Sequence, residues 1–305
     1  MKTAFVFPGQ GAQAVGMGAG FYDSKLCAEA NAILGFDVVG IMRGGPVEKL
    51  QTTSVCQPAL FLHSALVLEA LGLSGAPVQA DGYLGLSLGE YTALYAAGVL
   101  DFADTLRVLA ARGRAMEEAC RQSAGAMLSV LGLEDSQVED ICERARGGDV
   151  LQPANYNSPG QVVLSGAIPA IQRAATLVKE AGGRAIQLKV AGAFHSPLMQ
   201  TAAAPLRQAL AKVELRADTG QVISNVSARP LQRAELLETL VRQITAPVRW
   251  SQSIRFLAGE KGVGRFLELG CGKVLCGLIQ RTVPGIEVAA AATPEELAKL
   301  HPGRC

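Results

Sequence analysis

The sequence predicts an α/β protein in which a compact insertion interrupts a larger domain. A glycine-flanked serine turn at residues 85–89 lies between a short apolar run and a helical pattern. Residues 126–190 alternate in the order strand, helix, strand, strand, helix, strand, which is the split βαβ order of a ferredoxin-like unit. A chain of 305 residues is long enough to form one large domain and a smaller one.

The composition is that of an ordinary globular protein. Hydrophobic residues make up 49% of the chain and charged residues 18%, and the formal net charge is +1. This balance gives no support for nucleic acid or a membrane as a partner. No apolar run approaches the length of a membrane span, which is about 18 residues or more. The N-terminal apolar run is too short for a signal-peptide core, and the seven scattered cysteines contain no C-x-x-C pair. We therefore expect a cytoplasmic monomer with reduced thiols.

The first predicted strand covers residues 3–7, and a glycine-rich loop follows it. Residues 9–14 fit the letters of a dinucleotide-binding G-x-G-x-x-G/A motif. More glycines follow where a crossover helix should begin, and Glu29 lies inside a helical stretch and not at the end of a second strand. The loop is therefore better explained as one that brings backbone amides close to a reacting centre.

The serine turn has the surroundings of a nucleophile elbow. Tyr83 and Leu84 end an apolar run, and residues 90–97 form a helical pattern closed by Gly98. Small flanking residues allow the sharp turn that exposes the serine hydroxyl, and the helix start supplies unpaired N–H groups. The pattern predicts that Ser87 is a nucleophile; the alternative is a glycine-rich turn with a buried serine.

Two long helices are predicted on either side of this turn. Residues 57–72 are apolar nearly all round, which is typical of a buried helix, and we interpret His63 as a hydrogen-bonded core residue. A helix is predicted from Asp101, a plausible N-cap, to residue 122, and its apolar side chains form one arc. The opposite, solvated side of this helix carries Arg107, Arg114 and Arg121.

Arg112 departs from this pattern because it projects from the middle of the apolar arc. An unpaired guanidinium there would cost several kcal/mol. Two interpretations remain open: a structural ion pair with a core carboxylate, or a clamp for the carboxylate of a ligand.

The insertion is predicted element by element from its alternating pattern. The strands cover residues 126–130, 151–154, 161–165 and 184–190, the helices cover 136–146 and 168–181, and a turn covers 157–160. His195 follows the last strand, in a loop before a helix that can start at Pro197. This position suits a mobile, accessible imidazole. Because His63 lies in the core helix and His301 in a polar tail, His195 is the best base candidate for Ser87.

Six motifs occur together in this chain and span about nine-tenths of it. With them, the chain resembles the malonyl-CoA:acyl carrier protein transacylases and the related acyltransferase domains of fatty acid and polyketide synthases. The motifs are F-P-G-Q-G at 7–11, G-x-S-L-G-E at 85–90, R-G-x-A-M at 112–116, G-A-F-H-S at 192–196, P-V-R-W at 247–250 and E-L-G-x-G-K-V-L at 268–275. Many members carry histidine before the nucleophile, where this chain has Leu86, so local packing near the turn is expected to differ.

The resemblance implies an α/β-hydrolase-like core with an inserted ferredoxin-like (βαββαβ) small subdomain. The large subdomain would then consist of residues 1–124 and 191–305, and the small one of residues 125–190. This division agrees with the alternation of predicted elements.

The resemblance also implies a catalytic arrangement. Ser87 and His195 would form a dyad in which the backbone carbonyl of Gln243 takes the place of the usual Asp. The backbone N–H groups of Gln10 and Leu88 would form the oxyanion hole.

The substrates implied are malonyl-CoA and the phosphopantetheine thiol of acyl carrier protein, joined by a ping-pong cycle through malonyl-serine. Arg112 would hold the malonyl carboxylate, Gln10 would also contact the substrate, and Phe194 matches the malonyl-type signature. Neither a metal nor a bound cofactor is implied.

Three alternatives stay open at this stage. They are a polyketide acyltransferase, a hydrolase of the same fold that uses water as the acceptor, and a catalytically silent module that docks carrier protein. An acidic carrier protein would need positive charge near the cleft. Lys189, Arg184 and Lys273 are the candidates because they flank the predicted site.

Overall fold

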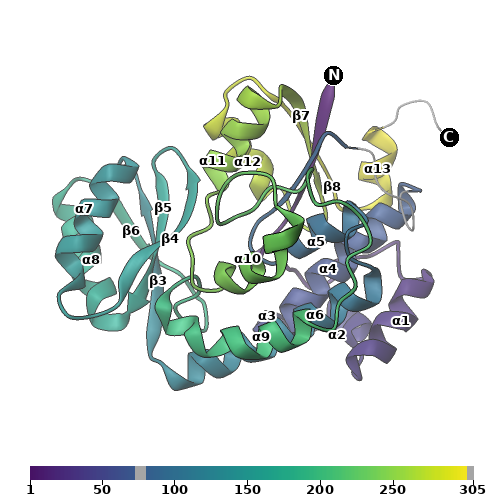
Figure 1. The fold of residues 1–305 in the computed structure, drawn as a ribbon, viewed down its shortest axis with the longest axis horizontal. Coiled ribbons are helices and arrows are strands. Elements are labelled where there is room, and N and C mark those ends of the chain that lie inside the picture. Colours follow the sequence, from purple (N-terminus) through teal and green to yellow (C-terminus); the bar gives the residue numbers. More distant parts are fainter. Residues whose placement is uncertain (73–79, 301–305) are drawn as a thin grey trace.

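The computed structural model describes residues 1–72 and 80–300. Its strands form two separate four-stranded sheets, one parallel and one antiparallel (Figure 1). This arrangement confirms the predicted mixed α/β class. No helix in the described ranges is long and apolar enough to cross a membrane.

The parallel sheet joins strands from both ends of the sequence. Its order is β2 (Gly82–Gly85), β1 (Lys2–Phe7), β7 (Val263–Leu269) and β8 (Glu287–Ala291). Phe7 lies opposite Gly85 in the register of β1 and β2. The loops that follow these two strands therefore leave the same edge of the sheet, where parallel α/β proteins usually bind ligands.

Helices surround this sheet; some contact its strands, and the others pack on neighbouring helices or on the antiparallel sheet. They are α1 (Lys25–Leu34), α2 (Val38–Gly44), α3 (Val47–Gln51), α4 (Thr53–Ala70), α5 (Gly89–Ala96), α6 (Phe102–Gln122), α9 (Ala203–Leu210), α10 (Leu236–Gln243), α11 (Trp250–Arg255), α12 (Val274–Thr282) and α13 (Pro294–Leu300). Short 3₁₀ turns lie at η1 (Pro197–Ala202) and η2 (Arg233–Glu235), and a π turn lies at η3 (Phe256–Glu260).

The two long helices agree with the sequence, apart from one boundary. Helix α4 is buried nearly all round, as expected, but it begins at Thr53, four residues earlier than predicted and with Pro58 inside it. The Asp101 side chain accepts a hydrogen bond from the Asp104 N–H at 2.6 Å and caps α6. The arginines predicted on the outer side of α6 are exposed, whereas Arg112 is completely buried.

The antiparallel sheet lies at the left end of the molecule in Figure 1 with its two helices. Its strands are β3 (Gly125–Leu131), β4 (Leu151–Ser158), β5 (Gln161–Ala167) and β6 (Arg184–Gln187), in the order β4-β5-β3-β6, and its helices are α7 (Asp135–Arg146) and α8 (Ile168–Glu180). The element order matches the predicted one.

Two strand boundaries in this sheet differ from the prediction by more than two residues. Strand β4 extends to Ser158 through two register irregularities, so it takes up half of the predicted turn. Strand β6 ends at Gln187 and not at residue 190, because Leu188 and Val190 leave the sheet to line a cavity.

The antiparallel sheet is buried on both faces along β3 and β5, whereas its edge strand β6 is largely exposed. Leu128 and Leu164 lie opposite each other and pack in the core under α7 and α8. Met127 and Val163 alternate with them and belong to the main core of the molecule. Because side chains alternate between the faces of a strand, this sheet has a core of its own and also forms a wall of the larger part.

Candidate active site

The serine turn is a strained strand-to-helix junction. Ser87 lies between β2 and α5 with φ of 55°, a conformation that side chains other than glycine rarely adopt. A Cβ added to Gly85 would lie 1.8 Å from the Gly89 carbonyl carbon, and one added to Gly89 would lie 2.4 Å from the Phe7 carbonyl oxygen. Both flanking positions therefore require glycine, because backbone fills the space around the turn.

Ser87 faces His195. The serine Oγ lies 2.8 Å from His195 Nε2, and His195 Nδ1 lies 2.8 Å from the carbonyl oxygen of Gln243. A carbonyl can only accept, so Nδ1 carries the proton and Nε2 is left as an acceptor toward the serine hydroxyl. The structure thus brings together the two residues of the expected dyad and the Gln243 carbonyl that the family resemblance implies.

The surroundings of His195 correct one expectation. The imidazole is 4% exposed and the residue adopts φ of 57°, so it is held in place and is neither mobile nor accessible. The following segment is η1, a 3₁₀ turn, which begins at Pro197. Burial, together with the charge of Arg112, lowers the pKa of His195 to about 4. The imidazole is therefore neutral, and able to accept a proton, at neutral pH.

Arg112 reaches the same point from α6. Its guanidinium donates to Gln57 Oε1 at 2.8 Å, to Ser87 Oγ at 3.0 Å and to Gln243 Oε1 at 3.1 Å. All three acceptors are neutral, and no ion pair of Arg112 is found within the described residues. A guanidinium stays charged even when buried, so a positive charge without a direct counter-ion lies beside the serine hydroxyl.

Two residues that sequence reasoning did not assign hold this arrangement. Asn225 accepts from the Ser87 N–H at 2.7 Å and donates to the Gly85 carbonyl at 2.7 Å. Glu90 is fully buried and accepts from Gln243 Nε2 at 2.6 Å, and burial raises the pKa of its carboxyl to about 7. A signal for Glu90 was present, since it is the single charged residue of the apolar helix after the turn.

Gln152 is a third residue that was missed. Its Nε2 donates to the carbonyl oxygens of His195 at 2.7 Å and Thr245 at 2.8 Å. This one amide on β4 therefore ties the antiparallel sheet to the loop of His195 and to the segment after Gln243. No sequence pattern could have found it, because its partners lie 43 and 93 residues away.

A cavity of about 170 Å³ lies over these groups. The predicted residues that line it are Gln10, Ser87, Leu88, Arg112, Phe194 and His195. The backbone N–H groups of Gln10 and Leu88 have no protein acceptor in the described part of the chain, which leaves both donors available at its edge. The opposite wall comes from the antiparallel sheet, with Met127, Asn155, Asn157 and Val163.

A wider cavity of about 690 Å³ adjoins this one and shares Gln10 and Val190 with it. Lys189 is exposed and lines the wider cavity. Arg184 is exposed at the start of β6, and Lys273 pairs with Glu296 at 2.8 Å. Of the three docking candidates, the structure brings only Lys189 to the mouth of the site.

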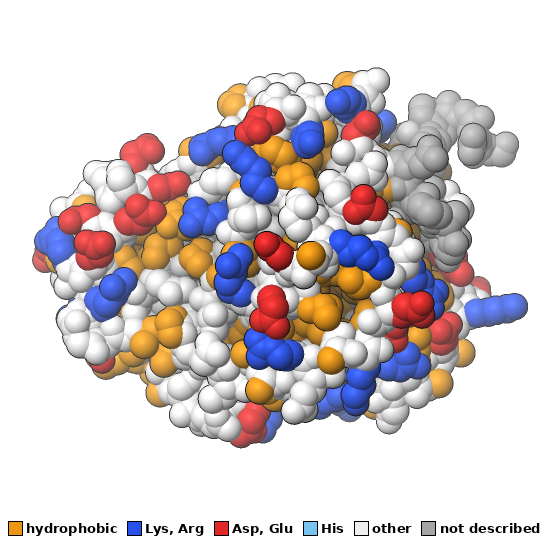
Figure 2. Space-filling view, viewed as in Figure 1, with side chains coloured by type: hydrophobic (Ala, Val, Ile, Leu, Met, Phe, Trp, Pro, Cys, Tyr) orange, Lys and Arg blue, Asp and Glu red, His pale blue; other side chains and the backbone are white. Residues whose placement is uncertain are grey.

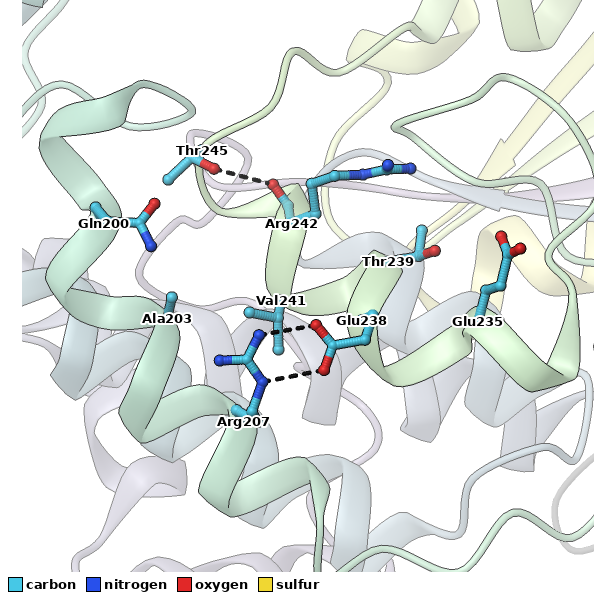
Figure 3. Close-up of a pocket in the computed structure, with 9 residues that line it drawn as sticks. All are labelled: Gln200, Ala203, Arg207, Glu235, Glu238, Thr239, Val241, Arg242 and Thr245. Carbon is cyan, nitrogen blue, oxygen red and sulfur yellow. Dashed lines mark hydrogen bonds and ion pairs between the residues drawn. The ribbon is translucent and has the colours of Figure 1, made fainter.

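A third cavity of about 510 Å³ lies between α9 and α10 (Figure 3). Arg207 and Glu238 face each other across it and form a two-pronged ion pair, with contacts of 3.0 and 2.8 Å. None of the predicted site residues lines it.

The other candidates fall outside the site. His63 is buried, with Nε2 2.8 Å from the Ala292 carbonyl oxygen, which confirms its interpretation as a core residue. His301 lies outside the described residues. The six cysteines between residues 27 and 276 are free thiols. The described residues contain no group of three or more His, Cys, Asp or Glu side chains that could hold a metal ion.

A serine and a histidine aligned at a strand-to-helix turn, beside a buried cation, define the class of serine acyl transferases. A family model of the acyl transferase domain matches residues 4–301. A malonyl CoA-acyl carrier protein transacylase of Escherichia coli is 41% identical over 97% of this chain and 98% of its own length. The chain therefore belongs to the malonyl CoA-acyl carrier protein transacylases of the acyl transferase family.

Solved structures agree with this assignment. An acyl carrier protein S-malonyltransferase from Vibrio cholerae is 39% identical with a TM-score of 0.91, covering 99% of this chain and 100% of its own. A malonyl-transacylase solved in complex with a type II PKS acyl-carrier protein is 37% identical with a TM-score of 0.92, covering 98% of both chains.

Proposed function

We propose that this chain transfers the malonyl group from malonyl-CoA to the phosphopantetheine thiol of acyl carrier protein, in the service of fatty acid biosynthesis. The names of its relatives support this substrate pair. The single observation that carries the proposal is the position of the Ser87 hydroxyl. Its oxygen lies 2.8 Å from a base nitrogen of His195 and 3.0 Å from the guanidinium of Arg112.

The first half of the reaction loads the serine. His195 Nε2 takes the hydroxyl proton while Ser87 Oγ attacks the thioester carbonyl of malonyl-CoA. The backbone N–H groups of Gln10 and Leu88 stabilise the resulting oxyanion, at about 3 kcal/mol for each donor. When the tetrahedral intermediate collapses, the C–S bond breaks and the CoA sulfur leaves with the proton from His195.

The second half runs the same steps in reverse with a new acceptor. His195 takes the proton from the phosphopantetheine thiol, the sulfur attacks the malonyl-serine carbonyl, and Ser87 leaves with the proton restored. Arg112 binds the free carboxylate of the malonyl group in both halves, which explains a cation with only neutral partners in a buried position. The scheme uses no metal and no bound cofactor.

We also propose a division of the chain into two subdomains. The large subdomain, residues 1–124 and 191–305, is α/β-hydrolase-like, supported by its parallel sheet and its serine turn. The small subdomain, residues 125–190, is ferredoxin-like, supported by the strand order β4-β5-β3-β6 and by helices α7 and α8.

Service to a polyketide pathway is the second candidate. The observation that favours it is the relative solved with a type II PKS acyl-carrier protein. Transfer rates to purified carrier proteins of the two pathways would separate them, and the faster acceptor identifies the pathway.

The chemistry is tested by incubating the chain with malonyl-CoA and weighing the intact protein. A transferase gains one malonyl group and keeps it until carrier protein is added. Rapid loss of the group to water would instead identify a hydrolase, and an unchanged mass would identify a silent docking module.

Lys189 is proposed as part of the surface that meets carrier protein, because it is exposed beside the site. Charged side chains of both signs are interspersed over the face shown in Figure 2, so attraction for an acidic partner has to be local. Lys189→Ala should slow transfer to carrier protein at low salt and leave loading from malonyl-CoA unchanged. Equal effects on both half-reactions would contradict this role; Lys273→Ala, whose amine already pairs with Glu296, is the matched control.

A further inference from the structure

The direction in which the Arg112 guanidinium points needs an explanation. Its three acceptors are Gln57, Ser87 and Gln243. The hydroxyl of Ser87 is consumed when the acyl group is loaded, so this acceptor is lost in the acyl-enzyme. The two side-chain amides then remain to hold the guanidinium.

The amide of Gln243 can serve Arg112 in one orientation only. Its oxygen accepts from Arg112, while its nitrogen donates to Glu90 Oε2 at 2.6 Å and to the Ser87 carbonyl at 3.0 Å. If the amide turned over, its N–H groups would face the N–H groups of the guanidinium, and donors do not bind donors.

Glu90 is placed to prevent that turn. In its ionised form this carboxylate can only accept. It is completely buried, and its Oε2 also receives the backbone N–H of Asn225 at 3.2 Å. Its other oxygen has no partner in the described part of the chain. A buried carboxylate is costly unless hydrogen bonds and an opposite charge compensate it. The Gln243 amide lies between Glu90 and the buried cation, Arg112.

We propose that Glu90 is a positioning residue for acyl-group selection: through the Gln243 side chain it holds the Arg112 guanidinium in the orientation that accepts an acyl carboxylate. Glu90 does not touch the acyl group. The inference rests on the proposed function, and it adds a residue that sets the preference for malonyl over neutral acyl groups.

The test compares initial rates of malonyl and acetyl addition to Ser87, measured by intact-protein mass spectrometry. Glu90→Leu removes the acceptor at similar volume, and the malonyl-to-acetyl ratio should fall about tenfold, the scale of one lost hydrogen bond in a charged site. Glu90→Gln keeps an acceptor oxygen, so its ratio should stay within about threefold of wild type, because only the charge is lost. Thr92→Val, another buried position on α5, is the matched control and should leave the ratio unchanged.

A merely structural role for Glu90 gives a different result. Both rates and the melting temperature would then fall together in Glu90→Leu, with the ratio unchanged, and that outcome overturns the inference. Failure of wild type to gain malonyl while it gains acetyl would overturn the proposed function instead, so the two failures are distinguishable.

A second variant covers the case in which Glu90→Leu does not fold. Gln243→Met keeps the backbone carbonyl that holds His195 and removes the amide between Glu90 and Arg112. Its ratio should fall about as far as expected for Glu90→Leu. A ratio that stays at the wild-type value would mean that the Gln243 amide does not orient Arg112, and that result would overturn the inference.

Discussion

The parallel and antiparallel sheets contribute different things to one cavity. The loops after β1 and β2 carry Gln10, Ser87 and Leu88. The antiparallel sheet contributes a wall of two apolar side chains, Met127 and Val163, and two neutral amides, Asn155 and Asn157.

The difference extends to backbone strain and buried charge. Ser87 and His195 both adopt positive φ, and the fully buried Arg112 and Glu90 lie beside them. The strands of the antiparallel sheet contain no charged residue before β6, and β6 begins at the exposed Arg184. Strain and buried charge persist only where the surroundings over-determine them. The candidate catalytic groups are therefore concentrated in the larger region, and the smaller region supplies a wall and an anchor, Gln152.

The largest effect is expected from removing the Ser87 hydroxyl in the larger region. Ser87→Ala should abolish malonyl addition, because the attacking oxygen is gone, while the melting temperature changes little. The matched control is Ser165→Ala on β5, a buried serine whose Oγ has no partner among the described residues. It should load malonyl at the wild-type rate. Normal loading by Ser87→Ala, read as a mass increase of the intact protein, would remove the nucleophile from this turn.

Arg112→Ala should give the next largest effect, on selectivity. Malonyl transfer should fall by the equivalent of about 2–5 kcal/mol, the usual loss when one partner of a desolvated charge pair is removed. Acetyl transfer should be spared, because a neutral acyl group gains nothing from the cation. Arg114→Ala, exposed on the outer side of α6, is the control. If the malonyl-to-acetyl ratio stayed constant while the melting temperature dropped, Arg112 would be a scaffold residue and nothing more.

The pH dependence of kcat/KM distinguishes a buried histidine base from one that is exposed to water. The pKa of His195 is lowered from 6.5 to about 4, so lowering the pH should protonate the base only near the lower value. The kcat/KM for acetyl-CoA, which has no acyl carboxylate to titrate, should therefore stay level from about pH 8 to about pH 5. An acid limb near the ordinary histidine value would show that the imidazole is accessible to water during turnover.

The smallest effect on chemistry is expected in the antiparallel sheet. Leu164→Ala empties a fully buried site under α7 and α8, which should cost about 2–5 kcal/mol of unfolding free energy. Denaturant unfolding measures this loss. Because Leu164 faces away from the cavity, loading by the folded protein should match wild type. A loading rate that fell in step with stability would contradict the division of labour between the two sheets.

Much of the fold was predictable because it depends on local patterns. The apolar patterns located β3, α7, β5 and α8 to within a few residues, since the two helices bury one face and the two strands are short runs of buried residues. The boundaries that moved did so for tertiary reasons. Strand β6 stops early where Leu188 turns toward the cavity, and α4 begins at Thr53 because Val55 and Cys56 pack in the main core ahead of Pro58.

Local sequence patterns were enough to find the serine turn, from its flanking glycines, and the unusual arginine, from its place in an apolar arc; the small number of histidines left His195 as the base. Folding was needed to show that His195 is buried, that Arg112 has no carboxylate partner within the described residues, and that Glu90 and Gln152 hold the site together. The reason is the sequence separation over which each interaction acts. Turn geometry and amphipathicity act between near neighbours in the chain, whereas hydrogen bonding and desolvation depend on residues that meet only after folding.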